Sequence, residues 1–284
     1  MKVNKVLLLI AMISFCFIGA NAQVKKEFEG EIVYRNFENH SKMVRRFSSG
    51  MAYNGARTVR VIMKGANMHI IDESLQMHTL LLPEQSKVIL YSDCLERGME
   101  FSFDAYVNNY MMSCSPDPRY VSGVKQENKY TMNKVSQGEF NGEICDIYKV
   151  DVEAILQAGE TVHHSELWVS SKYDIYKCYW YFLNGIQAPG IVLKRTLETN
   201  GKVPIFGKMN SFVASEVQEI KERLVSDDEM SVPKNFEIKV SDSPFKVVGL
   251  MKDTKKYLKK KKMYPGDAEK DLDVTFKIEE EWEF

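Results

Sequence analysis

The sequence predicts a mainly β protein whose strands form a sandwich or a barrel. Short segments in which apolar and polar residues alternate follow one another closely from Phe28 onward. Turns of two to four residues separate four of them, between Arg57 and Ser92, so these neighbours should pair antiparallel rather than form βαβ units. Hydrophobic residues make up 44% of the chain and aromatic residues 11%, enough to fill a core.

The N-terminal segment 1–22 has the pattern of a secretory signal peptide. Two lysines lie within the first five residues, Val6–Ile18 is apolar apart from Ser14, and the small residues Ala20 and Ala22 precede the expected cleavage site. We therefore expect cleavage before Gln23 and export to the periplasm or the outer membrane. The apolar run is shorter than the roughly 20 residues that a membrane span needs, and no later segment approaches that length.

The first strand is predicted directly after this segment, because Phe28, Gly30, Ile32 and Tyr34 alternate with charged residues. The stretch from Asn36 to Gly55 is rich in Asn, Ser and Gly, which is typical of a loop. Further strands are predicted at Arg57–Lys64, Met68–Asp72, Leu75–Leu82, Lys87–Ser92, Tyr130–Gln137, Ile144–Val152, Val162–Ser170, Asp174–Leu183 and Val192–Thr199.

One of these strands, Asp174–Leu183, is apolar on both faces. Such a strand is covered by protein on each side or lines a hollow. An ordinary position in a sandwich core explains the same pattern, and the sequence leaves both interpretations open.

Two stretches have helical rather than strand periodicity. Phe103, Tyr106, Val107, Tyr110 and Met111 recur at helical spacing, so the segment 101–112 is expected to form an amphipathic helix inserted between strands. This apolar stripe must pack somewhere, either as a lid over the mouth of the sheet or as a plug in a closed core. The segment 213–224 has similar spacing, but its β-branched residues keep a strand open as an alternative.

Four cysteines follow the predicted cleavage site, and an even number in an oxidising compartment is compatible with two disulfides. Cys94 and Cys114 flank the inserted segment, where a bond would fasten it at its base. Cys145 and Cys178 lie in aromatic-rich predicted strands that could be joined across a hairpin. Buried reduced thiols are the alternative for all four.

The sequence offers little support for catalysis, metal binding or nucleic-acid binding. His164 and Glu166 share a strand face and lie beside His163, yet no third ligand stands at a telling spacing. The acidic run Asp227–Glu229 lacks the alternating oxygen ligands of a calcium loop. No nucleophile turn or phosphate-binding loop is present, and the charge is nearly balanced. We expect neither an enzyme nor a cofactor.

The segment 242–284 differs from the rest in composition and is expected to be a charged extension. Lys252–Lys262 contains seven lysines and one aspartate, whereas Asp267–Glu283 contains eight acidic residues and two lysines. A solvated tail whose two halves pair is one interpretation. The other is a basic surface for an envelope protein or an anionic surface.

Several short motifs occur in an order that resembles one family of proteins. They are Phe28–Tyr34, Met63–Met68, the Ile71–Leu82 hairpin, Gly142–Tyr148, Glu166–Val169, Pro189–Gly190 and Met230–Phe236. In this order they resemble a family of exported bacterial proteins of unknown function whose fold is similar to the lipoprotein carrier LolA and its receptor LolB. The chain departs from the family at Met230, which replaces an aromatic residue, in the long Leu95–Gly123 insertion, and after Phe236.

The resemblance implies a strongly curved antiparallel sheet over residues 23–241, forming a half-open LolA/LolB-like barrel with one or two accessory helices. It also implies that the segment 213–223 is a strand, and that a hollow shelters an acyl chain or lipid. The residues expected to line this hollow are Tyr34, Met68, Leu80, Leu90, Trp168, Tyr179 and Tyr181. The rival expectation is an envelope interaction or structural protein whose own side chains fill the hollow and whose surface and charged tail carry the function.

Overall fold

The protein is represented by a computed structural model, which describes residues 26–41, 44, 54–110, 127–156, 159–170, 172–176, 179–183, 185–203, 207–241 and 246–264. The predicted signal peptide, Met111, Cys114, Cys178 and the acidic segment after residue 264 lie outside the described residues.

Twelve strands form one sheet in the order β14-β7-β6-β5-β4-β3-β2-β13-β12-β10-β9-β8. The strands are β2 (Gly30–His40), β3 (Gly55–Lys64), β4 (Asn67–Asp72), β5 (Met77–Leu82), β6 (Lys87–Ser92), β7 (Arg97–Ser102), β8 (Glu127–Phe140), β9 (Glu143–Leu156), β10 (Gly159–Ser170), β12 (Val192–Val203), β13 (Gly207–Glu222) and β14 (Glu237–Val240). All neighbours are antiparallel except β14 and β7. The prediction of a mainly β, antiparallel protein is confirmed. The edge strands β8 and β14 do not pair, so the described strands form no closed barrel.

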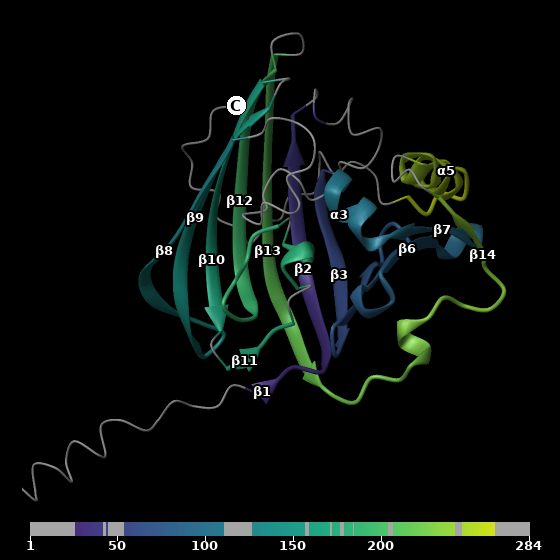
Figure 1. Ribbon diagram of the computed structural model, residues 1–284, viewed down its shortest axis with the longest axis horizontal. Coiled ribbons are helices and arrows are strands. Elements are labelled where there is room, and N and C mark those ends of the chain that lie inside the picture. The colour runs from purple at the N-terminus through teal and green to yellow at the C-terminus, as the bar shows by residue number, and fades with distance from the viewer. Residues whose placement is uncertain are drawn as a thin grey trace, which may run out of the picture.

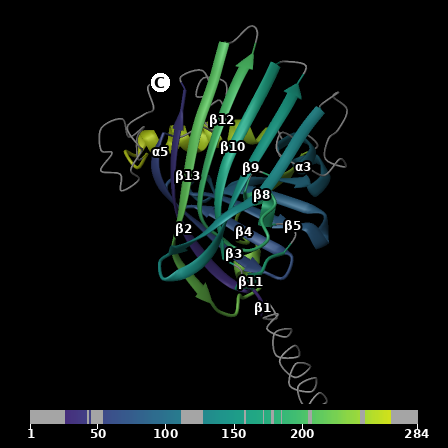
Figure 2. The ribbon, with the colours of Figure 1, turned by 90° about the vertical axis from the view of Figure 1, so that its left-hand side faces the viewer.

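The sheet curves so that its two halves face each other (Figure 1). Strands β8, β9, β10, β12 and β13 are 12 to 16 residues long and stand upright in this view, whereas β4 to β7 have six residues each and run across it. Figure 2 shows the short strands crossing behind the long ones. Register shifts near Val217, Trp168 and Lys134 mark irregularities that increase strand bending. We call the face that carries Tyr34 the inner face, and the face that carries Glu31 the outer face.

Helices lie on the inner side of the sheet. Helix α3 (Phe103–Tyr110) packs on β6 and β7, as the spacing of the inserted segment predicted. Helix α4 (Tyr179–Phe182) sits between the halves, and a short parallel pair of β1 (Lys26–Glu27) and β11 (Tyr173–Asp174) lies below it (Figure 1). The predicted strand Asp174–Leu183 is therefore wrong. Periodicity cannot separate a strand buried on both faces from a buried helical turn.

The open choice for the segment 213–224 is settled as a strand, because β13 continues to Glu222 and pairs with both β12 and β2. The interpretation of Asn36 onward as a loop is wrong, since β2 runs without interruption to His40.

The segment after β13, residues 223–236, crosses the outer face of the short strands, and we call it the outer strap. Val225 and Met230 pack on Ile62 and Ile71. Further along, Val232 and Phe236 pack on an outer cluster made of Leu80, Leu82, Ile89 and Tyr91. The strap then leads into β14 at the sheet edge.

The lysine-rich run lies largely on helix α5 (Val247–Lys260). Val247, Leu250, Thr254 and Leu258 form its buried stripe. They sit at a spacing of three or four residues, so one face of the helix packs on the domain while the lysines remain outside. The prediction of a charged extension for this segment did not include the helix.

Candidate functional site

The floor of the inner face is closed by α4. Tyr34 donates a hydrogen bond to the Val192 carbonyl at 3.1 Å, and the two tyrosine hydroxyls of Tyr34 and Tyr179 also bond. A tyrosine hydroxyl has a single proton, and that of Tyr34 is donated to the Val192 carbonyl. In the bond between the two hydroxyls, Tyr179 is therefore the donor. The Val192 amide donates to Tyr179 at 3.3 Å, which completes the ring. Burial and Tyr179 raise the pKa of Tyr34, and burial raises the pKa of Tyr179 to about 12.

A row of polar side chains crosses the inner face directly above this floor. Strand register places Arg195 beside Ser215, Ser215 beside Asn36, and Asn36 beside Arg57. Residues at these cross-strand positions point to the same face. Arg195, Ser215 and Asn36 are 3%, 3% and 6% exposed, so this lower polar row is buried.

A second polar row lies four residues further along the same strands. Register joins His163 to Thr199, Thr199 to Ser211, and Ser211 to His40. The His163 ring bonds Thr199 at 2.9 Å through Nδ1, and burial together with His164 lowers its pKa to about 4. Between this upper polar row and the lower one, Ser165 and Glu38 add further buried polar groups.

An ion-pair cluster ends the polar region on the β2–β4 side. Arg57 binds Asp72 at 2.6 Å and also pairs with Glu38, which in turn bonds the His40 ring at 2.8 Å. Burial opposes ionisation of Glu38, but Arg57 and His40 outweigh it and lower its pKa. Burial raises the pKa of Asp72, because Arg57 compensates it only in part and Glu38 adds like charge.

Buried polar atoms without a hydrogen-bond partner among the residues that the structure describes include Asn36 Oδ1, His40 Nδ1 and His163 Nε2. An unsatisfied buried polar atom carries a desolvation cost that a bonded one does not. Within the described residues, these atoms therefore leave hydrogen-bonding capacity unused next to a packed apolar floor.

The residues expected to line a hollow are divided between the faces. Tyr34, Met68, Leu90 and Tyr179 belong to the main core on the inner side. Leu80 is a correction, because it lies on the outer face in the cluster under the strap.

Trp168 is a second correction: it alternates with buried Leu167 along β10, and its indole donates to Glu166 at 2.8 Å on the outer face. Both errors follow from choosing apolar residues without knowing the strand register. Tyr181 lies in α4, but its side chain is outside the described residues.

The inserted helix contributes two of its predicted stripe residues to the main core. Phe103 and Tyr106 are each 9% exposed and belong to this cluster. The side chains of Val107 and Tyr110 lie outside the described residues, as does Met111.

Cys94 and Cys145 are free thiols. Their expected partners, Cys114 and Cys178, lie outside the described residues. Cys145 is buried, and burial raises the pKa of its thiol to about 11.

The candidate His163–His164 pair is split by the pleat of β10. His163 points to the inner face, whereas exposed His164 bonds Asp151 at 2.6 Å. Glu166 is engaged with Trp168. Within the described residues, no three His, Cys, Asp or Glu side chains are arranged to hold a metal ion.

Sequence reasoning missed the polar rows entirely. Their signal was the period-two placement of Tyr34, Asn36, Glu38 and His40, which continues the first strand with polar residues on the inward positions.

No helix among the described residues is long and apolar enough to cross a membrane. No protein-family model matches the chain, and no curated protein sequence matches it either.

Proposed function

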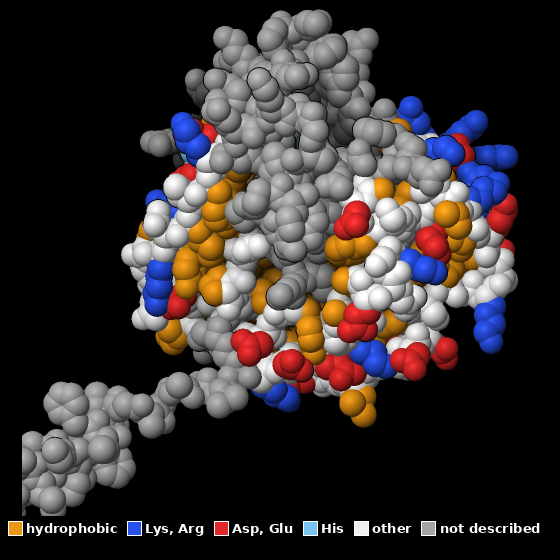
Figure 3. All heavy atoms as spheres, viewed as in Figure 1, with side chains coloured by type: hydrophobic (Ala, Val, Ile, Leu, Met, Phe, Trp, Pro, Cys, Tyr) orange, Lys and Arg blue, Asp and Glu red, His pale blue; other side chains and the backbone are white. Residues whose placement is uncertain are grey.

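We propose that the protein is an exported, non-enzymatic binding or carrier protein that shelters an acyl chain or another hydrophobic ligand against the inner face of its sheet. The observation that carries this proposal is a set of large apolar side chains at the free end of that face. Tyr130 and Met132 on β8 and Tyr148 on β9 pack against the main core yet are only partly buried. Figure 3 shows hydrophobic side chains in a band on this side of the molecule.

The chemistry of this surface suits a flexible apolar chain. Each CH₂ group moved from water to such a surface contributes about 0.8 kcal/mol. Met132 offers an unbranched, polarizable side chain that adapts to irregular shapes. The curved sheet and the resemblance to lipoprotein carriers support the same function, although a fold alone does not specify a ligand.

Two measurements test this proposal. Native mass spectrometry of gently purified protein should reveal co-purified lipid, and a fluorescent fatty acid should bind. Met132→Lys should abolish that binding, because a charge would interrupt the apolar surface. Val135→Lys is the matched control on β8, since Val135 is 50% exposed. Protein that carries no lipid and binds no fatty acid would remove the basis for a carrier.

Helix α5 favours a second function, an envelope interaction at an anionic membrane surface. Its outward face carries most of the lysine-rich run, and Lys256 and Lys260 line a shallow pocket with Arg97 and Tyr257. Basic residues near an anionic surface contribute about 1 kcal/mol each.

Sedimentation with vesicles of anionic lipid should then show salt-sensitive binding that is lost in a Lys256→Glu/Lys260→Glu variant. Equal binding to neutral vesicles would contradict this function.

A further inference from the structure

Asn36 Oδ1, His40 Nδ1 and His163 Nε2 are buried without a described hydrogen-bond partner and lie on the inner face of β2 and β10, which β13 and β12 separate in the sheet. We propose that the two polar rows bind an uncharged, hydroxyl-rich head group, of the sugar or polyol type, on the ligand whose apolar chain packs against β8 and β9. This inference rests on the proposed function and specifies the class of ligand for it.

Strand geometry gives the polar region the size of a head group. Asn36 and His40 are four residues apart on β2, a separation of about 13 Å along an extended strand. His163 is on β10, and three strand spacings of about 4.8 Å separate it from β2 along the sheet. These strands belong to one curved sheet (Figure 2). A disaccharide matches this area better than a single carboxylate does.

The charge of the lining favours an uncharged guest. The rows and the adjoining cluster contain two guanidinium groups, Arg57 and Arg195, and two carboxyl groups, Glu38 and Asp72. The low pKa of His163 keeps that ring neutral near pH 7. A charged head group would therefore bring a charge without a matching excess of opposite charge into a buried site.

Hydroxyl groups of a ligand can form hydrogen bonds with the buried atoms that have no described partner. A hydroxyl both donates and accepts, so it can satisfy Asn36 Oδ1 as well as the ring nitrogens of His40 and His163 in either tautomer. Ser211, Ser215 and Thr199 border the same area with hydroxyls of their own.

Three amphiphiles with the same twelve-carbon chain test the inference: dodecyl maltoside, laurate and dodecyltrimethylammonium. Calorimetry with the full chain below their micelle concentrations should give at least tenfold tighter binding of the maltoside than of the two charged amphiphiles. Asn36→Leu should weaken maltoside binding about tenfold and leave laurate binding unchanged. It should not lower the melting temperature, because it removes a buried oxygen that no described residue satisfies.

Asn67→Leu is the matched control. Asn67 Oδ1 is also buried without a described partner, but Asn67 lies at the β3–β4 turn, away from both rows. This variant should leave the affinity for all three amphiphiles unchanged. If Asn36→Leu fails to fold, His163→Phe removes a second atom of the site and should show the same selective loss.

The outcomes separate the two proposals. Equal binding of maltoside and laurate, or a maltoside preference that survives both substitutions, overturns the head-group site and leaves the carrier function standing. Absence of binding by all three amphiphiles overturns both.

Discussion

The short strands β4 to β7 are covered on both faces, whereas the long strands β8, β9, β10, β12 and β13 are largely open on the outer face. On the short strands the outer strap packs over Leu80 and Tyr91, while α3 and α5 cover the inner side. On the long strands, outward residues such as His164 are exposed. The short half thus resembles a conventional core, and the inner face of the long strands together with β2 carries the polar rows and the partly buried apolar side chains.

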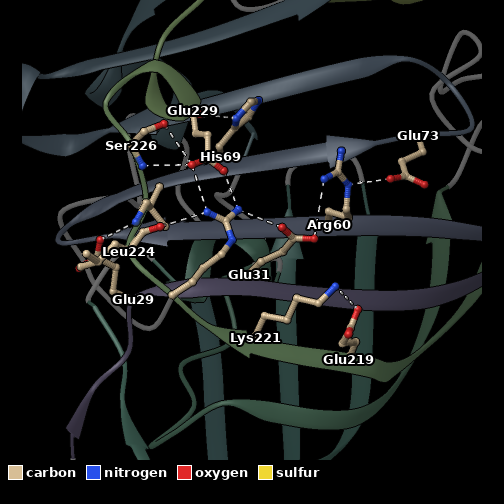
Figure 4. Close-up of polar contacts among 12 residues, drawn as sticks. Glu29, Glu31, Arg60, His69, Glu73, Glu219, Lys221, Leu224, Ser226 and Glu229 are labelled. Atoms are coloured by element: carbon tan, nitrogen blue, oxygen red, sulfur yellow. Dashed lines mark hydrogen bonds and ion pairs between the residues drawn. The ribbon is translucent and has the colours of Figure 1, made fainter.

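The outer strap is fastened by a polar network as well as by apolar contacts (Figure 4). Arg223 bonds Glu31 at 3.0 Å and Glu229 at 2.5 Å, and Glu29 accepts from the Val225 amide at 2.8 Å. His69 donates to the Glu229 carbonyl at 2.7 Å. These contacts join the strap to β2 and β4, so the cover of the short half is an integral part of the fold.

The largest expected difference between the halves concerns deletion of an outward side chain. Leu80 is 0% exposed beneath the strap, and Leu80→Ala should lower the free energy of unfolding by about 2–5 kcal/mol through lost burial and a residual cavity. Lys149→Ala, at an exposed outward position on β9, should cost less than about 0.5 kcal/mol. Urea unfolding followed by circular dichroism measures both. Similar losses would show that the two outer faces are equally buried.

Acid should destabilise both halves through one buried histidine in each. Burial and His78 lower the pKa of His69 to about 4, and burial with His164 does the same for His163. The unfolded chain binds these protons near pH 6.5, so stability is full above that pH and declines as the pH falls toward 4. Each residue contributes up to about 3 kcal/mol, since one pKa unit corresponds to about 1.4 kcal/mol.

Replacing each histidine by glutamine sharpens the comparison. His69→Gln and His163→Gln should each flatten the decline in unfolding free energy between pH 6.5 and 4. A profile that neither substitution changes would mean that these rings are protonated in the folded protein.

The sequence identified the parts of the fold in which pattern and environment agree. Met68–Asp72 and Lys87–Ser92 were predicted nearly to the residue, because tight turns bound short apolar runs. It failed where the inner face is polar. Asn36 and His40 were assigned to a loop because amide and imidazole side chains on inward positions interrupt the expected alternation. Buried polar residues do not follow the alternation of apolar and polar residues expected of a strand, and such departures are characteristic of functional sites.

Other elements could not be predicted from local pattern because tertiary contacts create them. The strap has no periodicity of its own, and its course follows from where Met230 and Phe236 find apolar partners. Strand β14 has only four residues, and its extended conformation depends on its pairing with β7. Leu80 and Trp168 were placed on the inner face in error, since the face of an apolar residue depends on register that only the assembled sheet specifies.

The ring of hydrogen bonds at α4 connects the halves on the inner side. Tyr34→Phe removes the acceptor of Tyr179 and the donor to the Val192 carbonyl. We expect a loss of about 1–3 kcal/mol in unfolding free energy, because the groups left behind stay buried. Hydrogen exchange at the Val192 amide should accelerate as α4 loosens. Unchanged stability would indicate that apolar packing alone holds α4.

The smallest expected effect concerns the polar fastening of the strap. Arg223→Met should cost only about 1 kcal/mol, because the arginine side chain is 32% exposed and water screens its pairs with Glu31 and Glu229. Lys64→Met is the matched control and should cost nothing measurable, since its partner Asp227 is 96% exposed.

The Arg223–Glu229 pair should also depend on pH. Arg223 lowers the pKa of Glu229 to about 2, so the contribution of this pair to stability should persist above about pH 4.5 and fade as the pH falls toward 2. That window lies below the histidine window, so urea unfolding of the Arg223→Met variant at pH 7, 4.5 and 3 separates the two. A loss of several kcal/mol at pH 7 would instead mean that charge, rather than the apolar contacts of Val225 and Met230, holds the strap on the short half.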